Sequence, residues 1–149
     1  MKQIILEQGV FTSIFYLSNK LQAEGDKLSN ELTLKQWFLL LLLYKGNLNN
    51  PTVNNLALEM GVTRQSMKKM VAILEKNGYL SVEKSSSDSR ALCISPTYKA
   101  YDFFQTNMLL GKKLLDKVFA GITQDELANA LQLLQKMQAN LRTAGEADE

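Results

Sequence analysis

Hydrogen-bond donors and positive charges are concentrated in the segment "GVTRQSMKK" (Gly61–Lys69). Ammonium and guanidinium groups bind phosphates, and arginine and glutamine side chains can read base edges in the major groove of DNA. The alternative is that these side chains form the solvated face of an ordinary amphipathic helix, and the segment alone does not decide between the two. The residues concerned are Thr63, Arg64, Gln65, Ser66, Lys68 and Lys69.

The residue types that carry most enzyme chemistry are absent or scattered. The chain has no histidine and a single cysteine, Cys93, which excludes histidine-based zinc sites, Ser-His and Cys-His pairs and an intramolecular disulfide. No glycine-rich phosphate loop is present, and the adjacent Asp125 and Glu126 suit the first turn of a helix, where acidic groups complement the helix dipole. We therefore expect no enzyme activity, no metal and no cofactor.

The composition is that of a folded protein of one domain or two small lobes. The 149 residues carry a net charge of +2, which is too small to indicate a nucleic-acid partner by itself. Between residues 60 and 79, however, Glu75 is the single acid among several basic side chains. The apolar run Trp37–Tyr44 is too short to cross a bilayer, and the N-terminus lacks a signal-peptide pattern. We expect a soluble cytoplasmic protein with no membrane partner.

Hydrophobic periodicity predicts the element order α-α-α-α-β-β-α-α. The helices are expected at 4–23, 33–46, 51–60, 64–76, about 96–120 and after 123, and the strands at 79–84 and 90–94. Asn50 is the expected N-cap of the third helix, with Pro51 at its first position and Pro96 starting the fifth. Thr63 is expected to cap the fourth helix, and Thr123 with Glu126 to form a capping box for the sixth. The second helix is apolar on nearly all sides, so we expect it to be central and buried.

The apolar positions of the fourth helix determine which of its sides faces outward. Residues Met67, Met70, Val71 and Leu74 follow the i, i+3, i+4, i+7 pattern of one buried face. The opposite side then carries Gln65, Lys68, Lys69 and Ala72, with Arg64 and Ser66 on the flanks.

Two short helices joined by a tight turn and followed by a hairpin predict a winged helix-turn-helix. Ala57 allows close approach of the two helices, and Gly61 allows the turn. We expect a mainly α fold with a small β-hairpin wing, in which residues 32–96 form the winged helix-turn-helix lobe. Residues 1–31 and 97–149 form a helical lobe.

The predicted hairpin carries Asp88 and Arg90 at its tip and Lys84 at its base. A basic residue at a wing tip can enter the minor groove of DNA. The alternative is an ordinary polar turn with an ion pair, and this stretch alone favours that alternative.

The stretch "TVNNLALEMGVTRQSMKKMVAILEKNGYL" followed by "DSR" resembles the MarR family of winged-helix transcriptional regulators. The most specific matches are "LAxxxGVTRQS", "LEKxGYL" and the Asp-x-Arg of the wing. The resemblance implies a homodimer that binds palindromic operator DNA. It implies recognition-helix roles for Thr63, Arg64, Gln65, Ser66, Lys68 and Lys69. It also implies that Arg90 approaches the minor groove and is oriented by Asp88. Such regulators usually repress, and many release DNA when a small aromatic compound binds between the lobes.

Four features depart from patterns found in the family. "PTYKA" (96–100) stands where the family commonly has Leu-Thr-x-Lys-Gly, and "SSSDS" (85–89) replaces an arginine-rich wing, which lowers the expected minor-groove charge. Cys93 lies on the predicted wing strand and not near the N-terminal helix, so an oxidation switch is not expected. The zinc-sensing members need histidines, which this sequence lacks.

The outer helices carry more apolar side chains than a thin helical arm can bury, which independently predicts a dimer. The alternative is a single larger monomeric core. The side chains are Ile4, Ile5, Val10, Phe11, Ile14, Phe15, Phe103, Phe104, Met108, Leu109, Leu110, Leu114, Leu115, Val118 and Phe119.

If a ligand site is present, it is expected between the lobes, with apolar walls from Phe11, Phe15, Trp37, Phe38 and Tyr44. For each of these residues taken singly, the sequence favours plain core packing instead. The competing function is a protein-interaction module on the same fold with weak or no specific DNA binding. The low charge of the wing motivates it.

Overall fold

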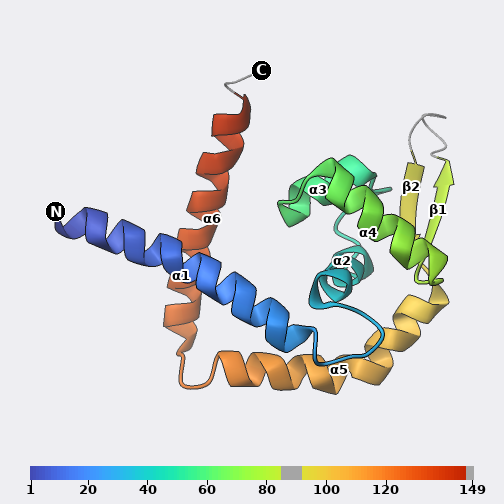
Figure 1. Ribbon diagram of the computed structural model, residues 1–149, viewed down its shortest axis with the longest axis horizontal. Helices are drawn as coiled ribbons and strands as arrows, with labels where there is room; N and C mark the ends of the chain where they lie inside the picture. Colours follow the sequence, from blue (N-terminus) through green and yellow to red (C-terminus); the bar gives the residue numbers. More distant parts are fainter. Residues whose placement is uncertain (85–91, 147–149) are drawn as a thin grey trace. The chain divides into compact units, whose positions relative to one another are not determined.

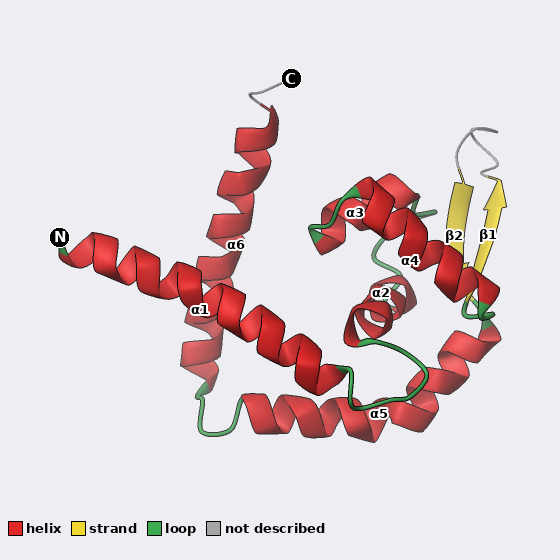
Figure 2. Cartoon of the chain, in the orientation of Figure 1, coloured by secondary structure: helices red, strands yellow, loops and turns green. Residues whose placement is uncertain are grey.

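In the part of the chain that the structure describes, six helices and a two-stranded antiparallel hairpin form in the order that the sequence predicts (Figure 1). The computed structural model describes residues 1–84 and 92–146. The elements are α1 (Lys2–Gly25), α2 (Leu34–Tyr44), α3 (Val53–Met60), α4 (Arg64–Lys76), β1 (Leu80–Lys84), β2 (Leu92–Pro96), α5 (Tyr98–Val118) and α6 (Gln124–Glu146). The predicted mainly α fold with a β-hairpin wing is confirmed (Figure 2). The chain divides into two units, Met1–Leu114 and Leu115–Glu149.

Helix α2 lies in the core of the first unit, as its apolar sequence predicts. Thr33 and Gln36 form a capping box at its start, in which each side chain accepts from the other residue's backbone N–H at 3.2 and 3.0 Å. The carboxylate of Asp26 accepts a further bond from Leu34 N–H at 2.7 Å. The prediction of burial on nearly all sides is wrong for Phe38 and Tyr44, which are 52% and 42% exposed. The other described elements cover only part of the helix circumference.

The core of the first unit fixes the buried side of α4. Leu39 and Leu40 of α2, Met67 and Leu74 of α4 and Ile94 of β2 are all fully buried, as is Leu56 of α3. Burial of one such side chain is worth about 1.5–3 kcal/mol, so this shared contact holds α3, α4 and the hairpin together. The face of α4 that the sequence predicted to be buried is therefore confirmed.

Helix α3 begins two residues later than predicted. Its N-cap is Thr52, whose hydroxyl accepts from Asn55 N–H at 3.3 Å, while the Asn55 side chain accepts from Thr52 N–H at 2.9 Å. The backbone carbonyl of Pro51 accepts from Ile94 N–H of β2 at 3.1 Å, so Pro51 is tied to the hairpin and cannot open the helix. Asn50, the predicted cap, has the left-handed φ of 47°.

Strands β1 and β2 pair from Leu80 opposite Pro96 to Lys84 opposite Leu92. Pro96 is thus the last residue of β2, and the prediction that it starts the fifth helix is wrong. Proline is tolerated at this outer position because a two-stranded sheet has an edge that needs no N–H donor. Thr97 follows it, and α5 starts at Tyr98.

The second unit contains the end of α5 and all of α6. Gly121, with φ of 75°, makes the turn between them. The predicted capping box is confirmed: the Glu126 carboxylate accepts from Thr123 N–H at 2.8 Å, and Thr123 Oγ1 accepts from Glu126 N–H at 3.3 Å. Hydrogen bonds from the Thr123 backbone and hydroxyl hold the pKa of Glu126 below its ordinary value. None of the helices in the described parts of the chain is long and apolar enough to span a bilayer.

Candidate nucleic-acid interface

The turn between α3 and α4 has the geometry that the sequence predicts for a helix-turn-helix. Ala57 is buried at 5% exposure, which lets the two helices approach closely. Gly61 has φ of 64°, a left-handed conformation that residues with a Cβ rarely adopt. Its N–H donates to Leu58 O at 3.3 Å, and Val62 N–H donates to Ala57 O at 3.0 Å. The turn therefore terminates α3 and fixes the direction in which α4 begins.

Thr63 and Ser66 together cap the first turn of α4. Thr63 Oγ1 accepts from Ser66 N–H at 3.1 Å, and its hydroxyl donates to Ser66 Oγ at 2.9 Å. The structure thus brings these two predicted site residues together and assigns both hydroxyls to the cap. The first N–H groups of a helix have no partner within it, so a helix start of this kind favours an anion.

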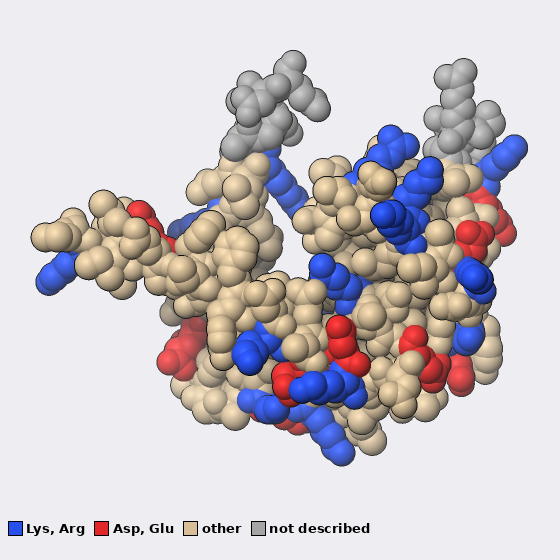
Figure 3. Space-filling model, in the orientation of Figure 1, with Lys and Arg blue, Asp and Glu red and all other residues tan. Residues whose placement is uncertain are grey.

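The outward side of α4 presents long polar side chains. Arg64, Gln65, Lys68 and Lys69 are all exposed, and none of them makes a hydrogen bond or ion pair to another described residue. Figure 3 shows basic side chains gathered over α4 on the face of the molecule turned toward the viewer. The predicted outward orientation is confirmed, and the four side chains are available to a polyanion.

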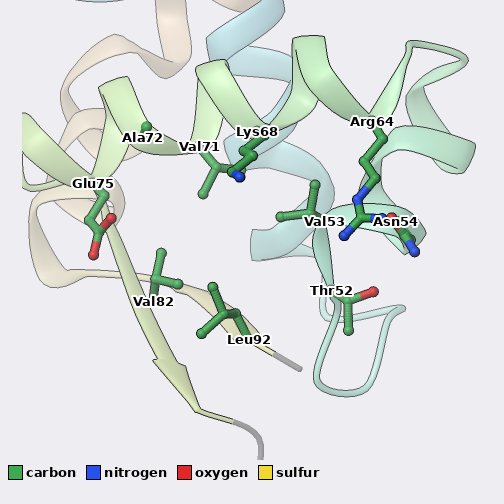
Figure 4. Close-up of a pocket in the computed structure, with 10 residues that line it drawn as sticks. All are labelled: Thr52, Val53, Asn54, Arg64, Lys68, Val71, Ala72, Glu75, Val82 and Leu92. Carbon is green, nitrogen blue, oxygen red and sulfur yellow. The ribbon is translucent and has the colours of Figure 1, made fainter. Parts of the chain in front are cut away.

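A groove of about 450 Å³ runs between α4, the start of α3 and the hairpin (Figure 4). Arg64 and Lys68 lie along its α4 side, and the guanidinium of Arg64 is directed toward Asn54. Glu75 lies at the other end of the α4 side. A phosphate would be attracted to the Arg64 end and repelled from the Glu75 end. The apolar lining comes from Val53, Val71, Val82 and Leu92.

Among the groove residues absent from the predicted site are two polar residues of α3 and its cap, Thr52 and Asn54. Both belong to the start of α3. The sequence could have indicated them, because α3 is the first helix of the predicted helix-turn-helix and its N-terminus lies beside α4. They were missed because the helix was predicted to start at Asn50 and Pro51, which left Thr52 without its role as the N-cap.

Only the base of the predicted wing falls within the described residues. Lys84 ends β1 and is exposed. The predicted wing residues Asp88 and Arg90 lie outside the residues that the structure describes.

The five residues expected to line a ligand pocket make separate contacts. Phe11 and Phe15 pair with each other on α1 at 5.1 Å between ring centres, and Trp37 packs edge-on against Phe103 at 5.0 Å. Tyr44 packs against Tyr101 and Phe104. Phe38 lines a hollow of about 270 Å³ together with Gln22, Leu34, Lys35, Met60 and Val62. Of the five, Phe38 alone lines this hollow, and none of them lines the groove beside α4.

Residues 32–92 match the sequence model of the MarR family. This range covers α2, the helix-turn-helix and the hairpin up to the start of β2, and therefore includes the whole outward face of α4. The chain contains a MarR-family domain. The structural resemblance to MarR-family regulators extends beyond that range to most of the chain.

Three solved structures illustrate the extent of that similarity. Sco3205, a MarR-family regulator from Streptomyces coelicolor in complex with DNA, has a TM-score of 0.79 at 21% identity, covering 92% of this chain and 88% of its own. A MarR/EmrR-family regulator from Acinetobacter sp. ADP1 gives 0.79 at 16%, covering 93% and 98%. Bordetella bronchiseptica BpsR, whose DNA binding is regulated by 6-hydroxynicotinic acid, gives 0.74 at 15%, covering 86% and 91%. At these identities the likeness establishes the fold of MarR-family transcriptional regulators.

Proposed function

We propose that this MarR-family protein is a transcriptional regulator that binds duplex DNA through the outward face of α4. The observation that carries the proposal is the division of one helix into two faces. Met67 and Leu74 anchor α4 in the core, while Arg64, Gln65 and Lys68 are exposed and make no hydrogen bond or ion pair to another described residue. A helix with this exposed donor set suits the major groove.

Each side chain has a distinct role in this proposal. Arg64, at the first position of α4 beside Asn54, contacts a guanine edge or a phosphate, and Gln65 reads a base. Lys68 and Lys69 bind phosphates, and the cap residues Thr63 and Ser66 present the helix N-terminus to the backbone. From the wing, Lys84 contributes charge near the hairpin base, and Arg90, oriented by Asp88, approaches the minor groove.

The protein acts in this proposal as a homodimer on a pseudo-palindromic operator. Residues 32–96 form the DNA-binding lobe, and residues 1–31 with 97–149 form the dimerisation lobe. Support comes from α1, on which Phe11 and Phe15 are each 59% exposed and Leu6 is 69% exposed. Apolar surface of that extent normally marks an interface. The site of action is the cytoplasm, and repression is the expected outcome of operator binding.

A small aromatic effector completes the proposal. BpsR, which shares the fold, responds to a hydroxylated aromatic acid. In this chain the aromatic side chains Phe11, Phe15, Trp37, Phe38 and Tyr44 offer apolar contact surface on α1 and α2. Trp37 is the only tryptophan, so quenching of its fluorescence reports on binding. Absence of quenching by a panel of aromatic acids, with DNA affinity unaltered, would remove the effector from the account.

The test of DNA binding is a salt titration of operator affinity for wild type and for the double variant Arg64→Ala with Lys68→Ala. Each lost phosphate contact should lower the slope of log K against log salt by about 0.9. Lys113→Ala, an exposed lysine of α5, is the matched control and should leave the slope unchanged.

The alternative function, a protein-interaction module on the same fold, is favoured by the serine-rich wing sequence "SSSDS". It predicts that the double variant binds DNA as weakly as wild type and with the same salt dependence. That result would reject the DNA-binding proposal.

A further inference from the structure

The C-terminal end of α4 is held against the start of α5 by a set of polar contacts. The hydroxyl of Thr97 donates to Gly78 O at 2.6 Å, and Thr97 N–H donates to Tyr79 O at 3.0 Å. The ammonium of Lys99 donates to Asn77 O at 2.9 Å and lies 4.5 Å from the centre of the Tyr79 ring. We call these five residues, together with Glu31, the α4–α5 clamp.

Tyr79 connects the clamp to the loop that precedes α2. Its ring is buried at 3% exposure and packs edge-on against Phe103, and its hydroxyl donates to the carboxylate of Glu31. Burial, and then the hydrogen bond and charge of Glu31, raise the pKa of Tyr79 to about 12. The phenol therefore stays protonated at physiological pH and remains a donor to Glu31.

The charge of Lys99 suits its place in the clamp. The last carbonyls of a helix carry the negative end of the helix dipole, and Asn77 is the C-cap of α4. An ammonium group that donates to this carbonyl makes a charge-assisted bond, which is stronger than a neutral one. The clamp thus fixes one end of α4 by directed bonds, whereas the apolar face of α4 alone would leave some freedom to tilt.

A small tilt of α4 about its clamped end would produce a large displacement of its other end, which faces DNA in the proposed function. Helix α4 has 13 residues, so at a rise of 1.5 Å per residue its N-terminus lies about 20 Å from the clamp. A tilt of about 10° would move that end by roughly 3 Å, close to the rise of one base pair in duplex DNA.

We propose that Tyr79, Thr97 and Lys99 are positioning residues that set the direction of α4 relative to α5, and with it the half-site spacing that a dimer accepts. This inference rests on the proposed function, since spacing has meaning only for a dimer that binds two half-sites. The variants Tyr79→Phe, Thr97→Val and Lys99→Met each remove one donor and keep most of the side-chain volume.

The first readout is the ratio of affinities for the preferred operator and for operators with one base pair added to or removed from the spacer. A variant that is only less stable has fewer active molecules and loses affinity for all operators equally, so this ratio stays constant. Loss of the neutral Thr97 hydroxyl bond should lower the ratio by about fivefold. Loss of the Lys99 or Tyr79 bond, each of which involves a charged group, should lower it further. Tyr98→Phe, at an exposed neighbour, and Lys113→Met are matched controls that should keep the wild-type ratio. Lys99→Arg should restore it.

The second readout needs no DNA. Amide hydrogen exchange at residues 77–80 should accelerate by about fivefold in Thr97→Val, and further in Lys99→Met, relative to the slowest core amides, while the controls keep the wild-type pattern. If wild type selects no operator, the proposed function fails, but exchange still tests the clamp. Unchanged exchange at 77–80 would show that the clamp does not hold α4. Faster exchange with an unchanged spacing ratio would show that it stabilises α4 without positioning it.

Discussion

At the residue scale, the side chains of α4 divide into those that build the helix and those that are available to a partner. Thr63 and Ser66 satisfy the first turn, and Met67 fills the core. Gln65 and Lys69 are exposed and make no hydrogen bond or ion pair to another described residue, so changing them should leave the fold intact and alter only recognition.

Gln65→Ala and Lys69→Ala should therefore have different effects on DNA. Gln65→Ala removes the amide that we propose reads a base, so it should relax the preference at one position of each half-site by about 1–3 kcal/mol. Lys69→Ala removes a proposed phosphate contact, so it should weaken binding to all sequences alike and lower the salt slope by about 1. A binding scan over operators with single base changes distinguishes the two. Equal loss for every operator in both variants would contradict the role of Gln65.

Tyr79 gives the protein a specific sensitivity to alkali. Its pKa is raised from 10.0 to about 12 in the folded state, chiefly by burial. The unfolded chain loses this proton at lower pH than the folded chain, so the stabilising contribution is complete below about pH 10 and is lost as the pH rises toward 12. Urea unfolding across that range should show a steeper decline for wild type than for Tyr79→Phe. If the free energy of unfolding declined equally with pH in both proteins, the raised pKa of Tyr79 would be contradicted.

At the element scale, local signals were sufficient to predict α4 and its turn. The cap at Thr63, the glycine at 61 and the spacing of Met67, Val71 and Leu74 all act within a few residues, and the structure confirms each. The start of α3 was predicted incorrectly because its determinant is remote: the carbonyl of Pro51 bonds to Ile94.

The clamp and the groove escaped prediction for the same reason. The bond from Tyr79 to Glu31 joins residues 48 positions apart, and no periodicity reports it. The predicted ligand walls Trp37 and Tyr44 are equally a matter of tertiary packing, since each meets an aromatic partner from α5.

The left-handed conformation at Gly61 makes a sharp prediction about the turn. Gly61→Ala should destabilise the protein by about 1–2 kcal/mol because φ of 64° strains any L residue, even though no atom crowds the new Cβ. Gly9→Ala is the matched control: this glycine lies within α1 with open space around it, so alanine should be neutral or stabilising by up to about 1 kcal/mol. Thermal unfolding measures both. A Gly61→Ala variant with the same thermal stability as wild type would contradict the turn geometry.

At the scale of the whole molecule, the exposed apolar side chains of α1 call for a partner surface. Of its 24 residues only Gly25 is buried, and the Phe11–Phe15 pair stands in solvent. We therefore expect Phe11→Lys with Phe15→Lys to convert a dimer to a monomer and to abolish tight operator binding. Leu58→Lys, at an exposed leucine of α3, is the control for oligomeric state. Sedimentation equilibrium measures the oligomeric state of each variant. A double variant that remains dimeric would exclude this face of α1 from the interface.

The central claim is that the outward face of α4 reads DNA sequence. The most direct measurement is selection from a random duplex pool by wild type and by the Arg64→Ala, Lys68→Ala double variant under the same salt conditions. The account predicts that wild type enriches an inverted repeat with half-site centres about 10 base pairs, one helical turn, or a multiple of that apart. It predicts no such enrichment by the double variant. Failure of wild type to enrich any motif, or enrichment of the same motif by both proteins, would contradict it.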